Sequence, residues 1–290
     1  MPLSLRQIRR RIKSVEGTKK MTRAMEMVAA AKLRKLQDLL RRSDRYIQEL
    51  ARILSTLVRE KPLSHPLLEK REEVHGTLVF LITSDTGLCG SYNTNVLDQA
   101  ARYLENTGRA ESVSFVSIGR NGAGYLKRQG RKIVKELSIP RPQELDQTVV
   151  ELNQMIQDAF ISKAADEIIL IYTHVESLAV LKPRVSKLLP IVSKITDKKI
   201  EGQTVDYILE PDLGQILDVL LPEYLAAEIG QCVKHSLVAE QASRMMAMRQ
   251  ATDNAKKMID ALTLSRNKAR QATITKELIE VVSGSRAQKK

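Results

Sequence analysis

Several residue types that shape most globular proteins are scarce in this chain of 290 residues. Trp is absent, aromatic residues make up 3%, and the two cysteines, Cys89 and Cys232, lie in different segments. Two separate cysteines do not make the framework of a disulfide-stabilised secreted domain, so we expect a reducing compartment. No apolar run reaches the length of about eighteen residues that a membrane-spanning helix needs. The sequence therefore predicts no span.

Glycine and proline are both missing between Gln231 and Ser283, a stretch of 53 residues. Because these two residues destabilise helix interiors most, their absence predicts one unbroken helix, which at about 1.5 Å per residue is roughly 80 Å long. Small or flexible residues recur along it at steps of three and four, which is typical of a narrow seam that meets one partner helix. These seam residues are Val238, Ala242, Met245, Met248, Thr252, Ala255, Ile259 and Leu262.

A second long helix is predicted at the beginning of the chain. Apolar residues follow one another at helical spacing from Leu5 through Met21, Met25 and Val28 to Leu57, and Pro62 ends the pattern. The small residues at positions 29–31 allow a second helix to pack closely. We therefore expect the two ends of the chain to form a long antiparallel coiled coil.

The middle of the chain alternates between apolar, β-branched runs and amphipathic segments, which predicts a doubly wound, Rossmann-like α/β domain inserted between the helices. The expected strands are Thr77–Thr83, Ser112–Ile118, Lys132–Leu137 and Glu167–Thr173, with Leu178–Val192 and Val205–Leu209 at an edge. The expected helices are Asn93–Glu105, Asn121–Gln129 and Glu144–Ala165. The predicted division is an N-terminal coiled-coil helix (1–61), a linker (62–75), the α/β domain (76–210) and a C-terminal coiled-coil helix (211–290), with Asp212 as its N-cap.

The net charge of +13 is concentrated in the two predicted helical ends. Residues 1–60 carry sixteen Lys and Arg against six Asp and Glu, and residues 223–290 carry twelve against seven. A basic surface implies an acidic partner, which is a nucleic acid, an anionic lipid or an acidic protein surface. A basic coiled coil that binds nucleic acid is one alternative, although zinc-finger spacing and aromatic stacking platforms are lacking.

No motif in the chain predicts a catalytic, cofactor-binding or metal-binding site. The glycines of Gly119–Gly124 are in the wrong order for a dinucleotide fingerprint, and neither a P-loop nor a zinc-ligand pair is present. The loop Ser84–Asn93 follows the first strand and places Cys89 between Gly87 and Gly90. A catalytic thiol at Cys89 is the second alternative. The structural interpretation is that Gly87 and Gly90 allow a tight left-handed loop in which Cys89 is a small buried residue.

The end of the C-terminal helix, Ala269–Gly284, has an unusual distribution of apolar residues. Its large apolar residues cover more than one side of the predicted helix: Ile274, Leu278, Ile279, Val281 and Val282. A helix that is apolar on several sides is normally enclosed. We therefore expect partners outside this chain to surround this tip.

Five motifs in this order resemble one known family, the gamma subunits of F-type ATP synthases. They are MEMVAAAKLRK (25–35), SDTGLCGSYN (84–93), YILEPD (207–212), SRMMAMRQATDNA (243–255) and NKARQATITKELIEVVSG (267–284). The resemblance covers essentially the whole chain. It implies a non-catalytic rotor shaft that couples ion-driven rotation of a membrane c-ring to conformational cycling of catalytic β subunits.

The resemblance also implies partners and site residues. One copy of the chain is expected inside a hexamer of α and β subunits, with the α/β domain against an epsilon subunit and the c-ring, no nucleic acid and no cofactor. Arg270 and Gln271 match positions that bind the β catch loop, and Met25 matches a segment that faces the β lever region. Ile274, Leu278, Val281 and Val282 are expected to turn in an apolar sleeve.

Two further expectations concern regulation and location. Photosynthetic members of the family carry an insertion in the α/β domain, with a regulatory cysteine pair in chloroplasts, and this chain has neither. We therefore do not expect thiol control by that route. The start of the sequence favours a bacterial protein, peripheral to the cell inner membrane on its cytoplasmic side.

Overall fold

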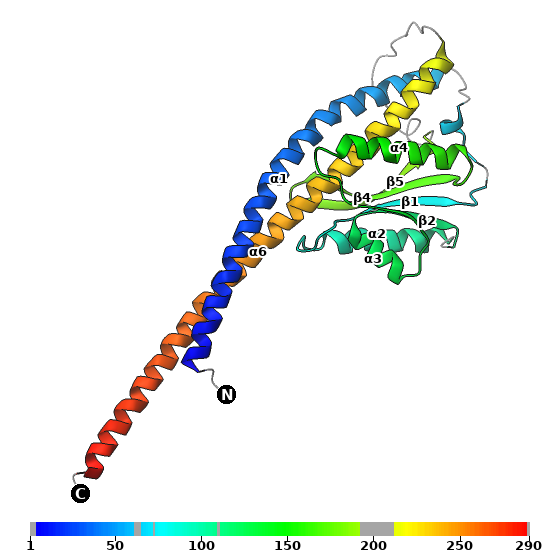
Figure 1. Ribbon diagram of the computed structural model, residues 1–290. Helices are drawn as coiled ribbons and strands as arrows, with labels where there is room; N and C mark the ends of the chain where they lie inside the picture. Colours follow the sequence, from blue (N-terminus) through cyan, green and yellow to red (C-terminus); the bar gives the residue numbers. More distant parts are fainter. Residues whose placement is uncertain (1–3, 61–64, 72, 109–110, 192–211, 289–290) are drawn as a thin grey trace. The chain divides into compact units, whose positions relative to one another are not determined.

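The computed structural model describes residues 4–60, 65–71, 73–108, 111–191 and 212–288 (Figure 1). In chain order the elements are α1 (Leu5–Glu60), the 3-10 helix η1 (Pro66–Leu68), β1 (Thr77–Ile82), α2 (Tyr92–Thr107), β2 (Val113–Ile118), α3 (Arg120–Arg128), β3 (Ile133–Leu137), α4 (Leu145–Ile161), β4 (Glu167–Ser177), β5 (Val180–Leu189) and α6 (Leu213–Gln288). Packing divides the chain into two compact units, residues 1–30 with 244–290 and residues 31–243. The four-part division given above stays a prediction.

Helix α6 confirms the prediction made from the missing glycine and proline, and α1 confirms the helix predicted from apolar spacing. Helix α1 has 56 residues and α6 has 76. The Asp212 side chain accepts a hydrogen bond from the backbone N–H of Gln215 at 3.1 Å, so the predicted N-cap is confirmed. Pro222 lies inside α6 without ending it, and the Asn153 amide of α4 donates to its carbonyl at 3.3 Å.

The inserted domain is built on a five-stranded sheet with the order β3-β2-β1-β4-β5. Strand β1 lies in the centre, is buried at every residue and pairs parallel with β2 and β4. Strand β5 pairs antiparallel with β4 at one edge, which confirms the edge position predicted for residues 178–192. Pro183 is tolerated there because an edge strand has one side without a ladder. The strand predicted at Val205–Leu209 lies outside the described residues.

Helices cover both faces of this sheet, as a doubly wound fold requires. Helices α2 and α3 lie on one face and α4 on the other (Figure 1). Successive side chains of β1 point to opposite faces of the sheet. Val79 and Leu81 share one face and pack in the cluster that includes Val96 of α2 and Phe115 of β2. The predicted fold class, α/β with long helices at both ends of the chain, is confirmed.

The segment 65–71 is anchored to the α/β domain, although the sequence indicated a linker. The Arg71 guanidinium pairs with the Asp166 carboxylate and donates to the Phe160 carbonyl at 2.6 Å. It also lies over the Phe160 ring, 4.8 Å from the ring centroid. This segment therefore packs on α4 and on the residue that precedes β4.

Helices α1 and α6 run antiparallel within each of the two units (Figure 1). In the first unit, the Thr22 and Thr252 hydroxyls are 2.8 Å apart and buried between the helices. In the second unit, the Gln231 amide donates to the Asp44 carboxylate at 2.9 Å. Within each unit the two helices therefore pair antiparallel, as the sequence predicts.

Candidate functional site

The last part of α6 is a helix that its own chain leaves uncovered. Every described side chain from Arg270 to Gly284 is exposed, and α6 continues past the first residues of α1 in Figure 1. The large apolar side chains predicted for an apolar sleeve are among them, and their exposed fractions are 44% for Ile274, 60% for Leu278, 70% for Val281 and 53% for Val282. Ile279 adds a further exposed apolar side chain. This stretch, residues 269–284, is called the tip below.

Arg270 and Gln271 stand at the start of the tip, and both are exposed. Residues three and four apart are neighbours on a helix surface, so both lie one turn before Ile274 on adjoining parts of the same face. Gln271, Ile274, Leu278 and Val281 continue that row. The geometry therefore joins a guanidinium and an amide to the apolar face of the tip.

The seam residues of α6 lie on the side that contacts α1 within the first unit. Met248, Thr252 and Ala255 are buried, and Met245, Ile259 and Leu262 are half-buried. The same steps of three and four continue to the half-buried Arg266 and Ala269. The seam thus ends one residue before Arg270, where the exposed tip begins.

The matching seam of α1 differs from the row that the sequence indicated. Met21, Met25 and Val28 belong to the apolar row that indicated this helix, but they are exposed, at 60%, 36% and 56%. Thr22 and Ala29 are buried instead. Small side chains let two helices approach closely, whereas three long apolar ones at these positions would hold them apart.

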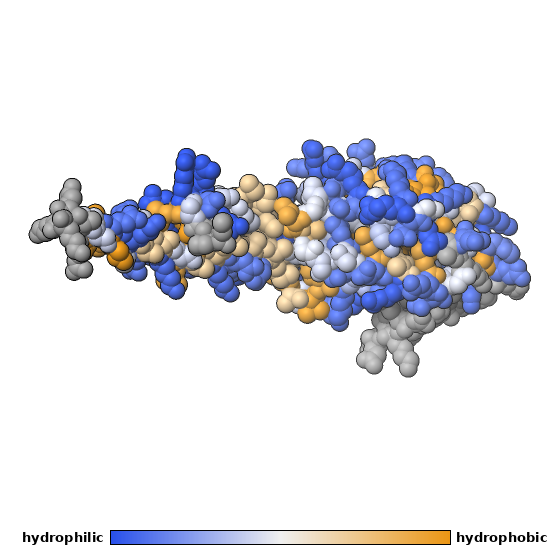
Figure 2. Space-filling model, turned by 90° about the horizontal axis from the view of Figure 1, so that it is seen from below, coloured by the Kyte–Doolittle hydropathy of each residue, from blue (hydrophilic) through white to orange (hydrophobic). Residues whose placement is uncertain are grey.

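The exposed methionines form a second apolar surface near the predicted lever contact. Met21, Met25 and Val28 follow at steps of four and three, so they share one face of α1. Figure 2 shows apolar side chains at the surface of the helical part, among hydrophilic ones. Sequence analysis predicted a role for Met25 alone. The exposure of Met21 and Val28 beside Met25 could not be predicted, because apolar residues at helical spacing more often mark a buried face.

The two units differ sharply in charge. Residues 1–30 and 244–290 carry nineteen Lys and Arg against six Asp and Glu, so they account for the entire net charge of +13. Residues 31–243 carry twenty-eight of each sign. A surface of this kind attracts an acidic partner.

The carboxyl edge of the sheet, where α/β domains usually bind ligands, is filled by the chain itself. Cys89 is 2% exposed, and its sulfur lies 3.4 Å from the Asn93 amide nitrogen and 3.7 Å from the Ser84 hydroxyl. The Ser243 hydroxyl of α6 donates to the Cys89 carbonyl at 2.6 Å. The left-handed residues of this loop are Leu88 and Gly90, so the expectation for Gly87 was wrong.

The glycines after β2 have a packing role at the same edge. Gly119 has φ +105°, and a Cβ on it would lie 2.3 Å from the Thr83 carbonyl oxygen. Gly122 also lies against Thr83, whose hydroxyl accepts its N–H at 2.8 Å. These glycines let α3 begin close to the end of β1.

Two histidines stack where α6 meets β4. The rings of His174 and His235 have centroids 4.1 Å apart, and the N–H of Val175 donates to Nδ1 of His235 at 3.3 Å. Burial first, and then the neighbouring His174, lower the pKa of His235 to about 4. The neutral ring is the form that accepts this bond, so the pair stabilises the contact rather than acting as a base.

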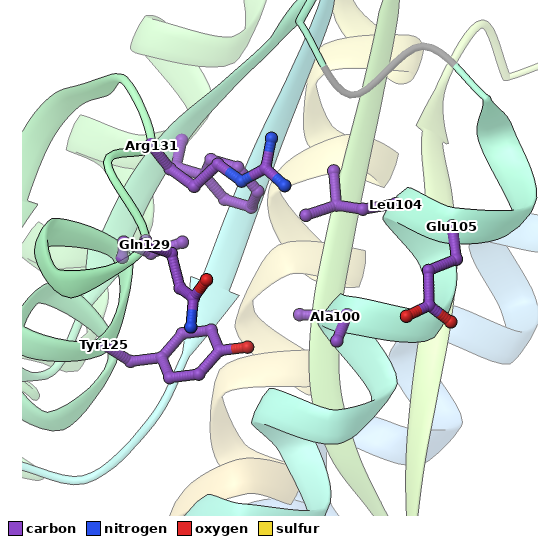
Figure 3. A pocket seen from close by; sticks show the side chains of 9 residues that line it. Ala100, Leu104, Glu105, Tyr125, Gln129 and Arg131 are labelled. Atoms are coloured by element: carbon purple, nitrogen blue, oxygen red, sulfur yellow. The ribbon is translucent and has the colours of Figure 1, made fainter.

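A cavity of about 270 Å³ lies between α2 and α3 (Figure 3). Tyr125, Gln129 and Arg131 line one side of it, and Leu104 and Phe115 are among its apolar lining residues. Phe115 lies in the first half of β2 and Arg131 precedes β3, so the cavity lies toward the amino ends of the strands. That end is opposite to the edge at which α/β domains usually bind ligands.

The residues that the structure describes also bear on metal binding and membrane insertion. Among those residues, no cluster of three or more His, Cys, Asp and Glu side chains is arranged to hold a metal ion. None of the described helices combines the length and the apolar character needed to cross a bilayer.

Comparisons with known proteins agree on one family. A family model described as ATP synthase matches residues 4–287. The ATP synthase gamma chain of Chlorobaculum parvum is 37% identical over 293 residues, which cover 99% of each chain. The ATP synthase gamma chain of an Acidovorax species is 39% identical over 287 residues, which cover 97% of this chain and 98% of the relative.

Solved structures show the same fold at lower identity. The rotor of the Euglena gracilis mitochondrial ATP synthase contains a chain that is 17% identical, with a TM-score of 0.68 over 93% of this chain and 98% of that one. The central stalk and c-ring of the Tetrahymena thermophila mitochondrial ATP synthase contain another, 23% identical, with a TM-score of 0.60 over 80% of this chain and 99% of that one.

Proposed function

Because the chain belongs to the family of ATP synthase gamma chains, we propose that the tip of α6 is the part of a central rotor shaft that turns inside a ring of α and β subunits. The chain is the non-catalytic shaft, and chemistry takes place on β. Rotation of a membrane c-ring is passed through the shaft to the β subunits, whose affinities for ADP, phosphate and ATP change in turn.

The exposed tip is the observation that carries this proposal. A lone helix is only marginally stable in water, and one with four large apolar side chains at 44% to 70% exposure also promotes aggregation. An apolar sleeve removes both problems, because it buries the tip without directional bonds that would hold it at one angle. A rotor needs such a bearing.

Arg270 and Gln271 provide the directional contact that an apolar bearing lacks. A guanidinium presents its N–H donors in a planar fork, which suits an acceptor group in one orientation. Both side chains are exposed next to the apolar face, so they can reach a loop of one β subunit at a time. We assign them to the β catch contact.

The basic unit supplies a second contact with the ring. Met25 lies with Met21 and Val28 on an exposed face of α1, and exposed basic residues such as Arg23 flank it. An acidic, partly apolar lever region of β complements both features. This partner accounts for the apolar stripe, which binding to nucleic acid does not explain.

The α/β domain is assigned to the remaining partners. Residues 76–210 have a net charge of zero. The face of the domain formed by α2 and α3 provides a surface for the epsilon subunit and the c-ring. The whole complex is bound to the cell inner membrane, with this chain peripheral on the cytoplasmic side. Its membrane association comes from the c-ring and not from a span of its own.

Reconstitution tests the assignment of Arg270 and Gln271. Purified α and β subunits are assayed for ATP hydrolysis with and without the chain, and gel filtration measures the stoichiometry. The natural chain is expected to stimulate hydrolysis with one copy per hexamer. The double variant Arg270→Ala with Gln271→Ala should assemble but lower turnover about tenfold, which corresponds to the loss of one or two charge-assisted hydrogen bonds.

Lys276→Ala is the matched control, because Lys276 is exposed on another side of the same tip and forms only a surface ion pair with Glu280 at 3.7 Å. It should leave turnover unchanged. Natural turnover in the double variant would remove the catch assignment. No stimulation and no co-elution with the natural chain would refute the shaft, and steep salt dependence of DNA binding would then favour the nucleic-acid alternative.

A further inference from the structure

One face of α6 is turned toward the carboxyl edge of the sheet inside the second unit. Ser236, Ala239 and Ser243 follow at steps of three and four, so they share that face. Ser236 and Ala239 are fully buried and Ser243 is 9% exposed. Together with His235 these residues are called the docking face below.

The docking face contacts β4 beyond the point where β1 ends. The pairing of β1 with β4 stops at Ile171. Two residues further along, the N–H of Thr173 donates to the Ser236 hydroxyl at 3.2 Å, and the N–H of Val175 donates to His235 at 3.3 Å. Thr173 and Val175 are two apart, so both N–H groups point to the side that β1 has left open. Side chains of α6 thus accept the hydrogen bonds of β4 in the place that β1 has left open.

A second anchor lies two turns further along α6. The Ser243 hydroxyl donates to the Cys89 carbonyl at 2.6 Å. The loop that carries this carbonyl is itself held by the Asn93 side chain. Its Nδ2 donates to the Ser84 hydroxyl at 2.7 Å, and its Oδ1 accepts the Ser84 backbone N–H at 3.0 Å. The acceptor is therefore fixed to the end of β1.

Between the two anchors, α6 contacts the loop after β1 and the start of α2 through apolar side chains. Ala239 packs against Cys89 and Tyr92. A small side chain brings the helix close to the sheet, but dispersion contacts have no preferred direction and let a helix turn about its axis. Hydrogen bonds weaken steeply when their angle changes. The polar pairs at the two anchors therefore add a directional resistance to turning that the apolar contact between them lacks.

We propose that Ser236 and Ser243 are positioning residues that lock α6 against rotation within the α/β domain, so that torque applied to the domain enters the shaft. This inference rests on the proposed function. Two anchors, one on β4 and one on the loop after β1, hold the helix from two elements, which a single bond does not achieve.

The test measures torsional stiffness in the assembled complex. The α and β ring is fixed to a surface, and a bead is attached to the exposed helix α3 through Lys127→Cys in the natural and variant chains. Thermal fluctuation of the bead angle reports the stiffness between the domain and the held tip. Ser236→Ala with Ser243→Ala should lower that stiffness about twofold, because the two directional bonds are lost. Ser243→Ala alone, near the surface, should fold readily and lower it less.

Ser55→Ala is the matched control. Ser55 is 4% exposed, but its hydroxyl donates only to the Arg52 carbonyl of its own helix, at 2.8 Å. It should lower the thermal stability of the chain without changing the stiffness. Equal stiffness in the natural complex, the double variant and the single variant would overturn the lock. Failure of the natural chain to stimulate hydrolysis or to rotate would refute the proposed function instead, so the two failures are separable.

Discussion

Two stretches of the same helix have opposite surroundings. Residues 231–243 of α6 are buried on nearly every side, including the polar Ser236, Glu240 and Gln241, whereas residues 270–284 are exposed throughout. The tip nevertheless has the larger apolar side chains. Burial within the chain therefore does not follow apolarity along α6. In the proposed shaft, the apolar residues of the tip meet a surface that another protein provides.

The largest expected effect compares a buried part of α6 with the tip. Leu225, which precedes the buried stretch 231–243, is itself fully buried, and Leu278 of the tip is 60% exposed. Leu225→Ala should lower the free energy of unfolding by about 2–5 kcal/mol, because it leaves a cavity. Leu278→Ala should change it by less than about 0.5 kcal/mol. Urea denaturation of the isolated chain at low concentration measures both changes in the free energy of unfolding. Similar losses in the two variants would show that the two parts of α6 do not differ in this way.

A smaller effect concerns the docked part alone. The pKa of His235 is lowered to about 4 in the folded chain, against about 6.5 for an unfolded histidine. The unfolded chain binds the proton more readily, so the stability that the neutral ring provides is complete above pH 6.5 and is lost as the pH falls toward 4. A loss of roughly 1–3 kcal/mol is expected between pH 7 and pH 4.5. Urea denaturation at the two pH values measures this loss.

Charges from the neighbouring elements modify this dependence. Asp44 of α1 raises the pKa of His235, while Arg184 of β5 and His174 of β4 lower it. Burial first, and then Arg184, also lowers the pKa of His174, which Glu176 and Asp44 oppose. His235→Asn keeps an acceptor for Val175 and removes one titrating group. It should flatten most of the pH dependence, and an unchanged slope would assign that dependence to other groups.

The sequence predicted the fold well because its strongest signals are local. Missing glycine and proline indicate a long helix without reference to any partner, and the buried run at residues 77–82 indicates a central parallel strand. Edge position followed from Pro183. Each of these inferences uses the backbone chemistry of one segment.

The packed face of α1 was harder to predict, because polar residues interrupt it. Its seam follows Ile12, Val15, Lys19, Thr22 and Glu26 before Ala29, and three of these six are charged or hydroxyl-bearing. The apolar row next to it, Met21, Met25 and Val28, has the same spacing and looks more like a core. Only the partner residue Thr252, which contacts the Thr22 hydroxyl, decides between the two rows.

The roles at the carboxyl edge of the sheet and at the tip depend on contacts far away in sequence or in another chain. The sequence showed that the Ser84–Asn93 loop is unusual, but its contact with Ser243 joins residues 154 positions apart. Among the residues that the structure describes, Arg270 and Gln271 make no contact that would distinguish them from a solvated surface. Their assignment comes from the family and from the exposed face they share with Ile274.

Hydrogen exchange of the tip tests the central claim most directly. Backbone amides of residues 269–284 are followed in the isolated chain and in the complex with α and β subunits, with α3 as an internal reference. Enclosure in an apolar sleeve predicts fast exchange in the isolated chain and strongly slowed exchange in the complex, while α3 stays unchanged. Equally fast exchange of the tip in a complex that hydrolyses ATP would contradict the account.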